Sequence, residues 1–136
     1  MIKPFTVVKN ISNEEVANLL CAGMEGGIGY WAKIVKYDKP AMLTYALDCF
    51  NPDGSPKHLY KHIDYPLNPG GAVYLMEEEA EVMEPLKIDR EALQDGLEVM
   101  AEKYPKHFAD FVEGGEDAVT GDVFIQCCVF GRIVYG

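Results

Sequence analysis

The sequence is poor in basic residues. Its 136 residues include 12 lysines and arginines but 22 aspartates and glutamates, which gives a formal net charge of −10 at pH 7. Proteins that bind a phosphate backbone concentrate lysine and arginine on one face. The charge balance therefore argues against direct nucleic-acid binding. Mimicry of DNA gains little support, because the acidic residues are not spread along the chain in a phosphate-like array.

Long apolar runs and paired cysteines are also absent. No stretch approaches the roughly 20 apolar residues of a membrane span, and the start, M-I-K-P-F, lacks the features of a signal peptide. Cys21, Cys49, Cys127 and Cys128 include no C-x-x-C pair, which argues against zinc ribbons and thioredoxin-like redox sites. We expect a cytoplasmic protein without a membrane segment, with buried free thiols.

Known catalytic and metal-binding motifs are missing as well. The sequence has no nucleophile elbow and no HExxH motif, so no catalytic residue is assigned. The glycines at positions 26, 27 and 29 follow a predicted helix and lack a GK[ST] sequence, unlike a nucleotide-binding loop. His58 and His62 would lie about 13 Å apart on an extended segment. We therefore expect no metal site and no cofactor.

A capping box marks the first predicted helix. Ser12 and Glu15 have its spacing, apolar residues recur with helical period from Val16 to Met24, and Gly26 is expected to end the helix at the C′ position.

Two further helices are predicted in the second half of the chain. Asp89 can act as an N-cap for the first. Pro105 ends that helix and can begin the next one, which closes at Gly114 and Gly115.

The remaining apolar segments predict strands joined by turns. Prolines and glycines interrupt the chain between them, which is typical of hairpin connections. The predicted strands are residues 5–8 (an edge strand), 30–37, 41–50, 59–65 and 72–76.

The stretch from Glu25 to Trp31 is the first candidate for a binding site. Gly26 and Gly27 permit positive φ values and close approach of another group, and two aromatic residues follow at Tyr30 and Trp31. If a strand begins at Tyr30, these two side chains point to opposite faces, so one of them faces a groove or a partner. The alternative is an ordinary turn in which Trp31 anchors the core through a backbone carbonyl.

Asp122 and Gln126 form a second candidate. They stand four residues apart, so on a helix they share one face and offer hydrogen bonds to a base edge, an amide or a sugar hydroxyl. In the alternative, Gln126 satisfies a buried backbone group and Asp122 caps a helix or forms an ion pair. The candidate ligand-binding residues are therefore Glu25, Gly26, Gly27, Tyr30, Trp31, Asp122 and Gln126.

Three segments of the chain resemble a family of small bacteriophage and prophage proteins, most of them uncharacterised. The middle of the chain, residues 36–85, does not take part in the resemblance, and the family assigns no catalytic residue. The three segments are Ala22-x-x-Glu25-Gly26-Gly27-x-x-Tyr30-Trp31, Glu102-Lys103-Tyr104-Pro105-x-His107-Phe108-Ala109-Asp110, and Asp117-Ala118-x-Thr120-x-Asp122-Val123-Phe124-x-Gln126 with Phe130-Gly131 and Val134-Tyr135-Gly136.

The resemblance also bears on the fold. Residues 122–130 have strand propensity, yet Asp117 or Thr120 can cap a helix there, and the resemblance favours the helix. We therefore predict one α+β domain, residues 1–136, with a small, mainly antiparallel sheet. An N-terminal helix and about three C-terminal helices pack on it.

For function, the resemblance implies a phage protein in the cytoplasm of a bacterial host. We expect a non-catalytic accessory protein that binds a nucleotide-type signal or a host protein to counter antiviral defence, and a homo-oligomer is a further expectation. One alternative is a small hydrolase or transferase that uses Asp117 and Asp122 on such a ligand. Another is a structural or assembly protein of a phage.

Overall fold

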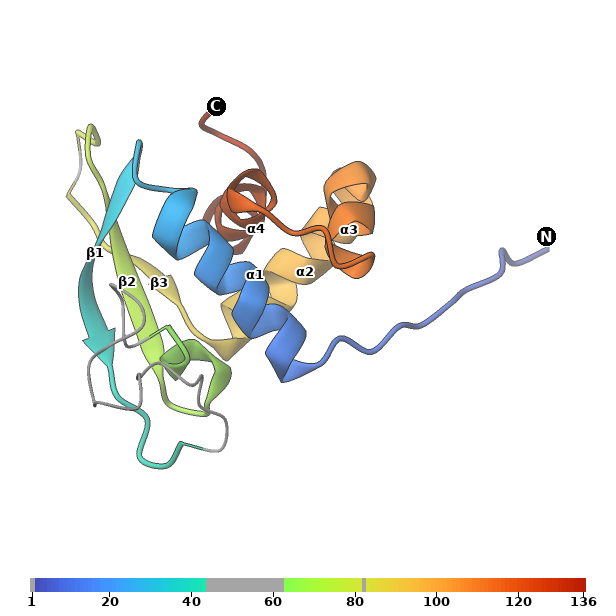
Figure 1. The fold of residues 1–136 in the computed structure, drawn as a ribbon, viewed down its shortest axis with the longest axis horizontal. Coiled ribbons are helices and arrows are strands. Elements are labelled where there is room, and N and C mark those ends of the chain that lie inside the picture. The colour runs from blue at the N-terminus through green and yellow to red at the C-terminus, as the bar shows by residue number, and fades with distance from the viewer. Residues whose placement is uncertain (1, 44–62, 82) are drawn as a thin grey trace.

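The computed structural model describes residues 2–43, 63–81 and 83–136. In Figure 1, a small sheet lies on one side of the molecule, and helix α4 lies between α1 and α2. The predicted α+β fold class is confirmed. The elements are α1 (Asn13–Gly26), β1 (Ala32–Asp38), the 3-10 helix η1 (Tyr65–Leu67), β2 (Ala72–Glu77), β3 (Leu86–Ile88), α2 (Arg90–Lys103), α3 (Pro105–Val112) and α4 (Ala118–Phe130).

The start of α1 is the predicted capping box. The Ser12 hydroxyl oxygen accepts from the Glu15 backbone N–H at 3.1 Å, and the Glu15 carboxylate accepts from the Ser12 N–H at 3.2 Å. The end of α1 differs from the prediction, because Gly26 is still helical and Gly27 caps the helix with φ −99°. Positive φ is therefore not what the glycines supply here.

The glycines instead permit close approach between two helices. A Cβ atom on Gly27 would lie 2.5 Å from the carbonyl oxygen of Ala118, at the start of α4. Gly23 and Gly121 face each other in the same way, since a Cβ on Gly23 would lie 2.6 Å from the Gly121 carbonyl oxygen. Only glycine lets α1 and α4 pack this closely. This contact positions the residues that follow α1, Tyr30 and Trp31 among them, beside α4.

The sheet is antiparallel, in the order β1-β2-β3. Val73, Leu75 and Ile88 are buried on the face toward the helices, whereas Lys33 and Lys87 are exposed. The strands predicted at 30–37 and 72–76 are thus found with small shifts in their ends. The short strand β3 was not predicted.

The three other strand predictions are wrong or fall partly outside the described residues. Residues 5–8 are extended but pair with no strand in the described part of the chain, so the edge-strand prediction is wrong. Residues 41–43 form no strand, and residues 63–65 enter a turn and η1, where Pro66 favours helical φ. The rest of the predictions at 41–50 and 59–65, and the pair His58 and His62, fall outside the described residues.

The C-terminal helices begin as predicted. Asp89 accepts from the Ala92 N–H, and Asp117 accepts from the Thr120 N–H, both at 2.9 Å. The helix prediction for residues 122–130 is confirmed by α4. Residues 120 to 127 are all buried, and a helix that is apolar on all sides has no amphipathic period to distinguish it from a strand.

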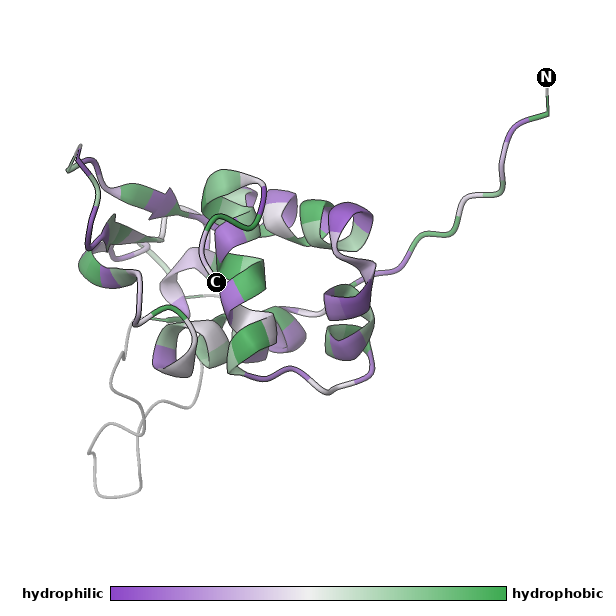
Figure 2. Cartoon of the chain, turned by 90° about the horizontal axis from the view of Figure 1, so that it is seen from above, coloured by the Kyte–Doolittle hydropathy of each residue, from purple (hydrophilic) through white to green (hydrophobic). Residues whose placement is uncertain are grey.

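Residues 2–11 form an extended arm that leaves the body of the molecule before α1 (Figures 1 and 2). Its large apolar side chains are exposed: Ile2, Phe5, Val7 and Val8 all exceed 80% exposure. No helix among the described residues has the length and apolarity that crossing a membrane requires.

Candidate ligand-binding pocket at the junction of α1 and α4

The carboxylate of Asp122, in the first turns of α4, is the centre of the candidate site. It is buried and accepts three side-chain hydrogen bonds. Trp31 Nε1 donates to Oδ1 at 2.8 Å, Gln126 Nε2 donates to the same oxygen at 3.0 Å, and the Tyr30 hydroxyl donates to Oδ2 at 2.6 Å. Hydrogen bonds to an ionised acceptor are about twice as strong as neutral ones, so this carboxylate fixes the turn after α1 against α4.

Tyr30 and Trp31 have different surroundings, but not through alternation along a strand, because neither residue belongs to β1. Trp31 is 3% exposed and Tyr30 is 57% exposed. Both nevertheless bond the same carboxylate, because the chain is still turning at these residues and β1 begins only at Ala32. The Trp31 indole was expected to bond a backbone carbonyl if it were a core anchor. It is a core residue, but its partner is Asp122.

Gln126 joins the pocket to the C-terminal tail, residues 131–136. Its side-chain oxygen accepts from the backbone N–H groups of Val134 and Tyr135 at 2.7 and 2.9 Å, and its Nε2 also donates to the Tyr135 carbonyl at 3.1 Å. Gln126 is completely buried. As the alternative expected, Gln126 satisfies backbone groups, which here are partly buried. The other half of that alternative is wrong, because Asp117 caps α4 and Asp122 accepts from three side chains instead.

The tail in turn packs against Trp31. The Tyr135 ring stacks on the indole with a centroid distance of 5.0 Å and an interplanar angle of 11°, and its hydroxyl donates to Glu77 at the end of β2 at 2.5 Å. Phe130 lies at the other edge, 5.5 Å from the indole centroid. Such offset aromatic pairs add about 0.5–1.5 kcal/mol beyond their burial, so the tail is a fixed wall.

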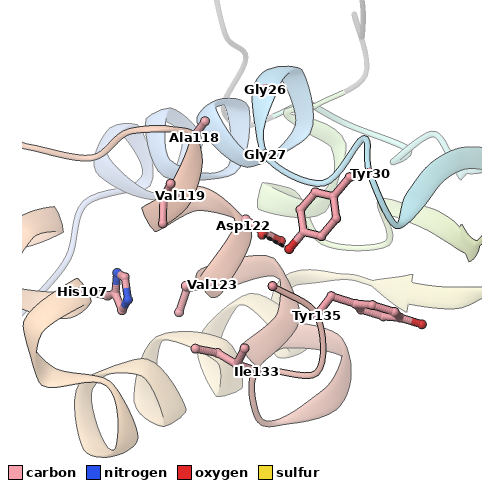
Figure 3. Close-up of a pocket in the computed structure, with 11 residues that line it drawn as sticks. Gly26, Gly27, Tyr30, His107, Ala118, Val119, Asp122, Val123, Ile133 and Tyr135 are labelled. Carbon is pink, nitrogen blue, oxygen red and sulfur yellow. Dashed lines mark hydrogen bonds between the residues drawn. The ribbon is translucent and has the colours of Figure 1, made fainter.

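An open pocket of about 340 Å³ lies beside this network (Figure 3). Tyr30 and Asp122 form one end, and His107 of α3 lies at the other, across a floor of Val123 and Ile133 (Figure 3). This volume is at the lower end of the range of about 300–1,000 Å³ for small-molecule sites. The lining is completed by Gly26, Gly27, Ala118, Val119, Tyr135 and Gly136.

The predicted site residues are thus only partly brought together. Gly26, Gly27, Tyr30 and Asp122 line the pocket. Two others, Trp31 and Gln126, lie in the core and hold Asp122 in place. Glu25 is on the exposed surface of α1 and does not line the pocket.

Other lining residues were missed as ligand contacts. His107, Ile133 and Tyr135 lie far from the glycine stretch in sequence. The segments that resemble phage proteins contain His107 and Tyr135, and that was the only sequence signal for them. The three segments meet at this pocket, since the first provides Tyr30, the second His107 and the third Asp122.

The electrostatics of the pocket favour a protonated phenol. Partial burial, and then the hydrogen bond to Asp122, raise the pKa of Tyr30 to about 12. At neutral pH Tyr30 is a hydroxyl that donates to Asp122 and presents oxygen lone pairs to the pocket.

No family model, curated protein or solved structure matches this chain. What the pocket can hold therefore rests on its own geometry.

Nor does the described part of the chain group three or more histidine, cysteine or acidic side chains in a way that could hold a metal ion. The pocket instead combines an apolar floor with hydrogen-bonding groups at two ends. Such a lining suits a small flat organic molecule with polar edges.

Proposed function

We propose that this chain is a non-catalytic binding protein whose pocket, between Tyr30, Asp122 and His107, takes a small nucleotide-type molecule. The observation that carries the proposal is the convergence of three distant segments on one pocket with a preorganised carboxylate. We expect a flat base to lie between the apolar floor and the exposed ring of Tyr30, where aromatic stacking contributes about 1–3 kcal/mol per base.

The charge of the pocket narrows the ligand class. Asp122 brings a carboxylate to its wall, and the chain as a whole is acidic. Phosphate groups are therefore expected to point out of the pocket, while the base or ribose end, which carries N–H and O–H donors, points toward the hydroxyl oxygen of Tyr30.

The engagement of both candidate acids favours binding over catalysis. Asp117 caps α4, and backbone and side-chain hydrogen bonds from Thr120 lower its pKa. Asp122 accepts three hydrogen bonds. A general base needs a carboxylate that can reach and accept a substrate proton. Both oxygens of Asp122 and Oδ1 of Asp117 already accept hydrogen bonds within the fold.

The biological role follows from the resemblance. A phage accessory protein that captures a host nucleotide-type signal would blunt antiviral defence, and the pocket is the place where we expect capture. Binding of a host protein at the same surface, and an assembly role, are the alternatives to this proposal.

The test is native mass spectrometry of the purified protein, followed by release of any ligand under denaturing conditions, and then titration with nucleosides and nucleotides. A binding protein returns its ligand intact, whereas an enzyme returns it changed. Val119→Glu places a second negative charge on the pocket wall at a site that is 61% exposed. A glutamate at this position also suits the first turn of α4, where the helix dipole favours a negative charge.

We expect Val119→Glu to weaken binding at least about tenfold, equal to about 1.4 kcal/mol, without lowering thermal stability. Met83→Glu, at a similarly exposed position outside the pocket, is the matched control and should bind normally. Absence of binding by every nucleoside and nucleotide in the panel, together with no co-purifying molecule, would remove the proposal.

A further inference from the structure

The arm, residues 2–11, is the least explained part of the molecule. Phe5 is fully exposed and Val7 is 91% exposed, although both belong to a β-prone run. Soluble proteins seldom leave a contiguous apolar segment uncovered unless it binds something. An extended segment without a strand partner also presents unpaired backbone N–H and C=O groups.

A groove of about 600 Å³ lies next to the base of the arm. Residues 7–11 form one wall, and Leu97, Ala101 and Phe108 of α2 and α3 contribute to the other. The arm lines this groove but does not fill it, because Val7 and Val8 remain almost completely exposed. There is therefore space for a second extended segment between the arm and α2.

Charge indicates what that second segment is. Residues 2–11 contain two lysines, Lys3 and Lys9, and no acidic residue, in a chain whose net charge is −10. One acidic residue of α2, Glu98, lines the groove. The other acidic residues of α2 are also exposed, and they are Glu91, Asp95 and Glu102. A basic, apolar, extended segment complements this groove, and the arm has that composition.

Length also fits. Residues 7–11 already form a wall of the chain's own groove, so residues 2–6 project beyond it. Five extended residues span about 17 Å, enough to lie along the groove of a neighbouring molecule whose arm is paired with this one. A two-fold arrangement buries both arms at once, because each groove receives the other molecule's arm.

We propose that two copies of this chain exchange their arms. The two arms pair antiparallel, and the apolar side chains of each, Phe5 and Val7 among them, fill the groove against α2 and α3 of the other copy. The lysines then lie beside the acidic residues of α2. This assembly leaves the pocket at Tyr30 and Asp122 unchanged and does not depend on its ligand.

Sedimentation of the full chain over a range of concentrations tests the exchange. The wild type should be a dimer, and Phe5→Asp should dissociate at least about 100-fold more readily, because it places a charge in an apolar groove. Its thermal unfolding as a monomer should be unchanged, since Phe5 is fully exposed in the isolated chain. Met83→Asp, at another exposed apolar position, is the control and should remain dimeric.

Zero-length carbodiimide cross-linking of a mixture of ¹⁴N and ¹⁵N protein identifies which chain the arm reaches. We expect peptides that join Lys3 or Lys9 to Glu98 or Glu102, with one isotope on each side. Cross-links within one isotope only would show that the arm folds back on its own chain. That result, a monomer at all concentrations, or a dimer that Phe5→Asp leaves intact would each overturn the exchange.

Discussion

The two ends of α1 differ sharply. Before Ser12, the chain extends into solvent with Ile2, Phe5, Val7 and Val8 exposed, and only Ile11 of the arm packs against the core. After Gly26, two consecutive aromatic residues bond one buried carboxylate at 2.6 and 2.8 Å. The same helix thus joins a segment that the described residues leave largely uncovered to a segment fixed by contacts from α4 and the tail. The contrast teaches which end of α1 is specified by contacts within the described chain.

The largest expected effect is at the fixed end. Asp122→Ala leaves the buried Trp31 N–H without its acceptor, and loss of a buried charged acceptor costs about 2–4 kcal/mol. Denaturant unfolding should therefore show a stability loss of this size. Asp122→Asn keeps an acceptor for Trp31 and should lose less than half as much. If Asp122→Ala were as stable as the wild type, the carboxylate would not be what fixes this end of α1.

A smaller loss of stability is expected for a substitution at Gly23, about one turn before the end of α1. Gly23→Ala would put a methyl group 2.6 Å from the Gly121 carbonyl oxygen and 2.4 Å from Ile125 Cδ1, and overpacking of this kind costs about 1–3 kcal/mol. Gly29→Ala is the matched control, because a Cβ there meets nothing within 4 Å. Thermal melts of the two variants should differ clearly. Equal melting temperatures would mean that α1 and α4 separate at little cost.

The smallest expected change in stability concerns Tyr30, and it appears only at alkaline pH. A tyrosine whose folded pKa is raised contributes stability below its unfolded pKa of about 10, and this contribution is lost as pH rises through the folded value of about 12. Wild-type stability should fall more steeply between pH 10 and 12 than that of Tyr30→Phe. Parallel pH profiles for the two proteins would show that the hydrogen bond to Asp122 does not hold the phenol proton.

Local signals in the sequence predicted the fold well. Ser12, Asp89 and Asp117 each cap a helix with bonds to a residue three positions ahead, and such short-range chemistry is legible from spacing. The position of the C-terminal tail could not be predicted in this way. Gln126 bonds residues that have no regular structure of their own, and a pattern of polar residues cannot reveal such a partner.

The candidate site was predictable only as separate pieces. Trp31 and Asp122 are 91 positions apart in sequence, so their spacing carries no information about contact. The strand prediction at 5–8 failed for a related reason. Propensity describes how a segment behaves when a sheet edge is within reach, and the arm leaves the molecule on the side opposite the β1-β2-β3 sheet (Figure 1).

The hydrogen bonds between the Gln126 side chain and the C-terminal tail can be followed by hydrogen exchange. The amide protons of Val134 and Tyr135 are held by one side chain and not by a helix or a sheet ladder, so their exchange with solvent follows the opening of this single wall. Hydrogen exchange at these two amides therefore gives a residue-level readout of whether the tail is bound to Gln126, in the free protein and in any complex. A ligand that seats against Tyr135 should slow both protons together.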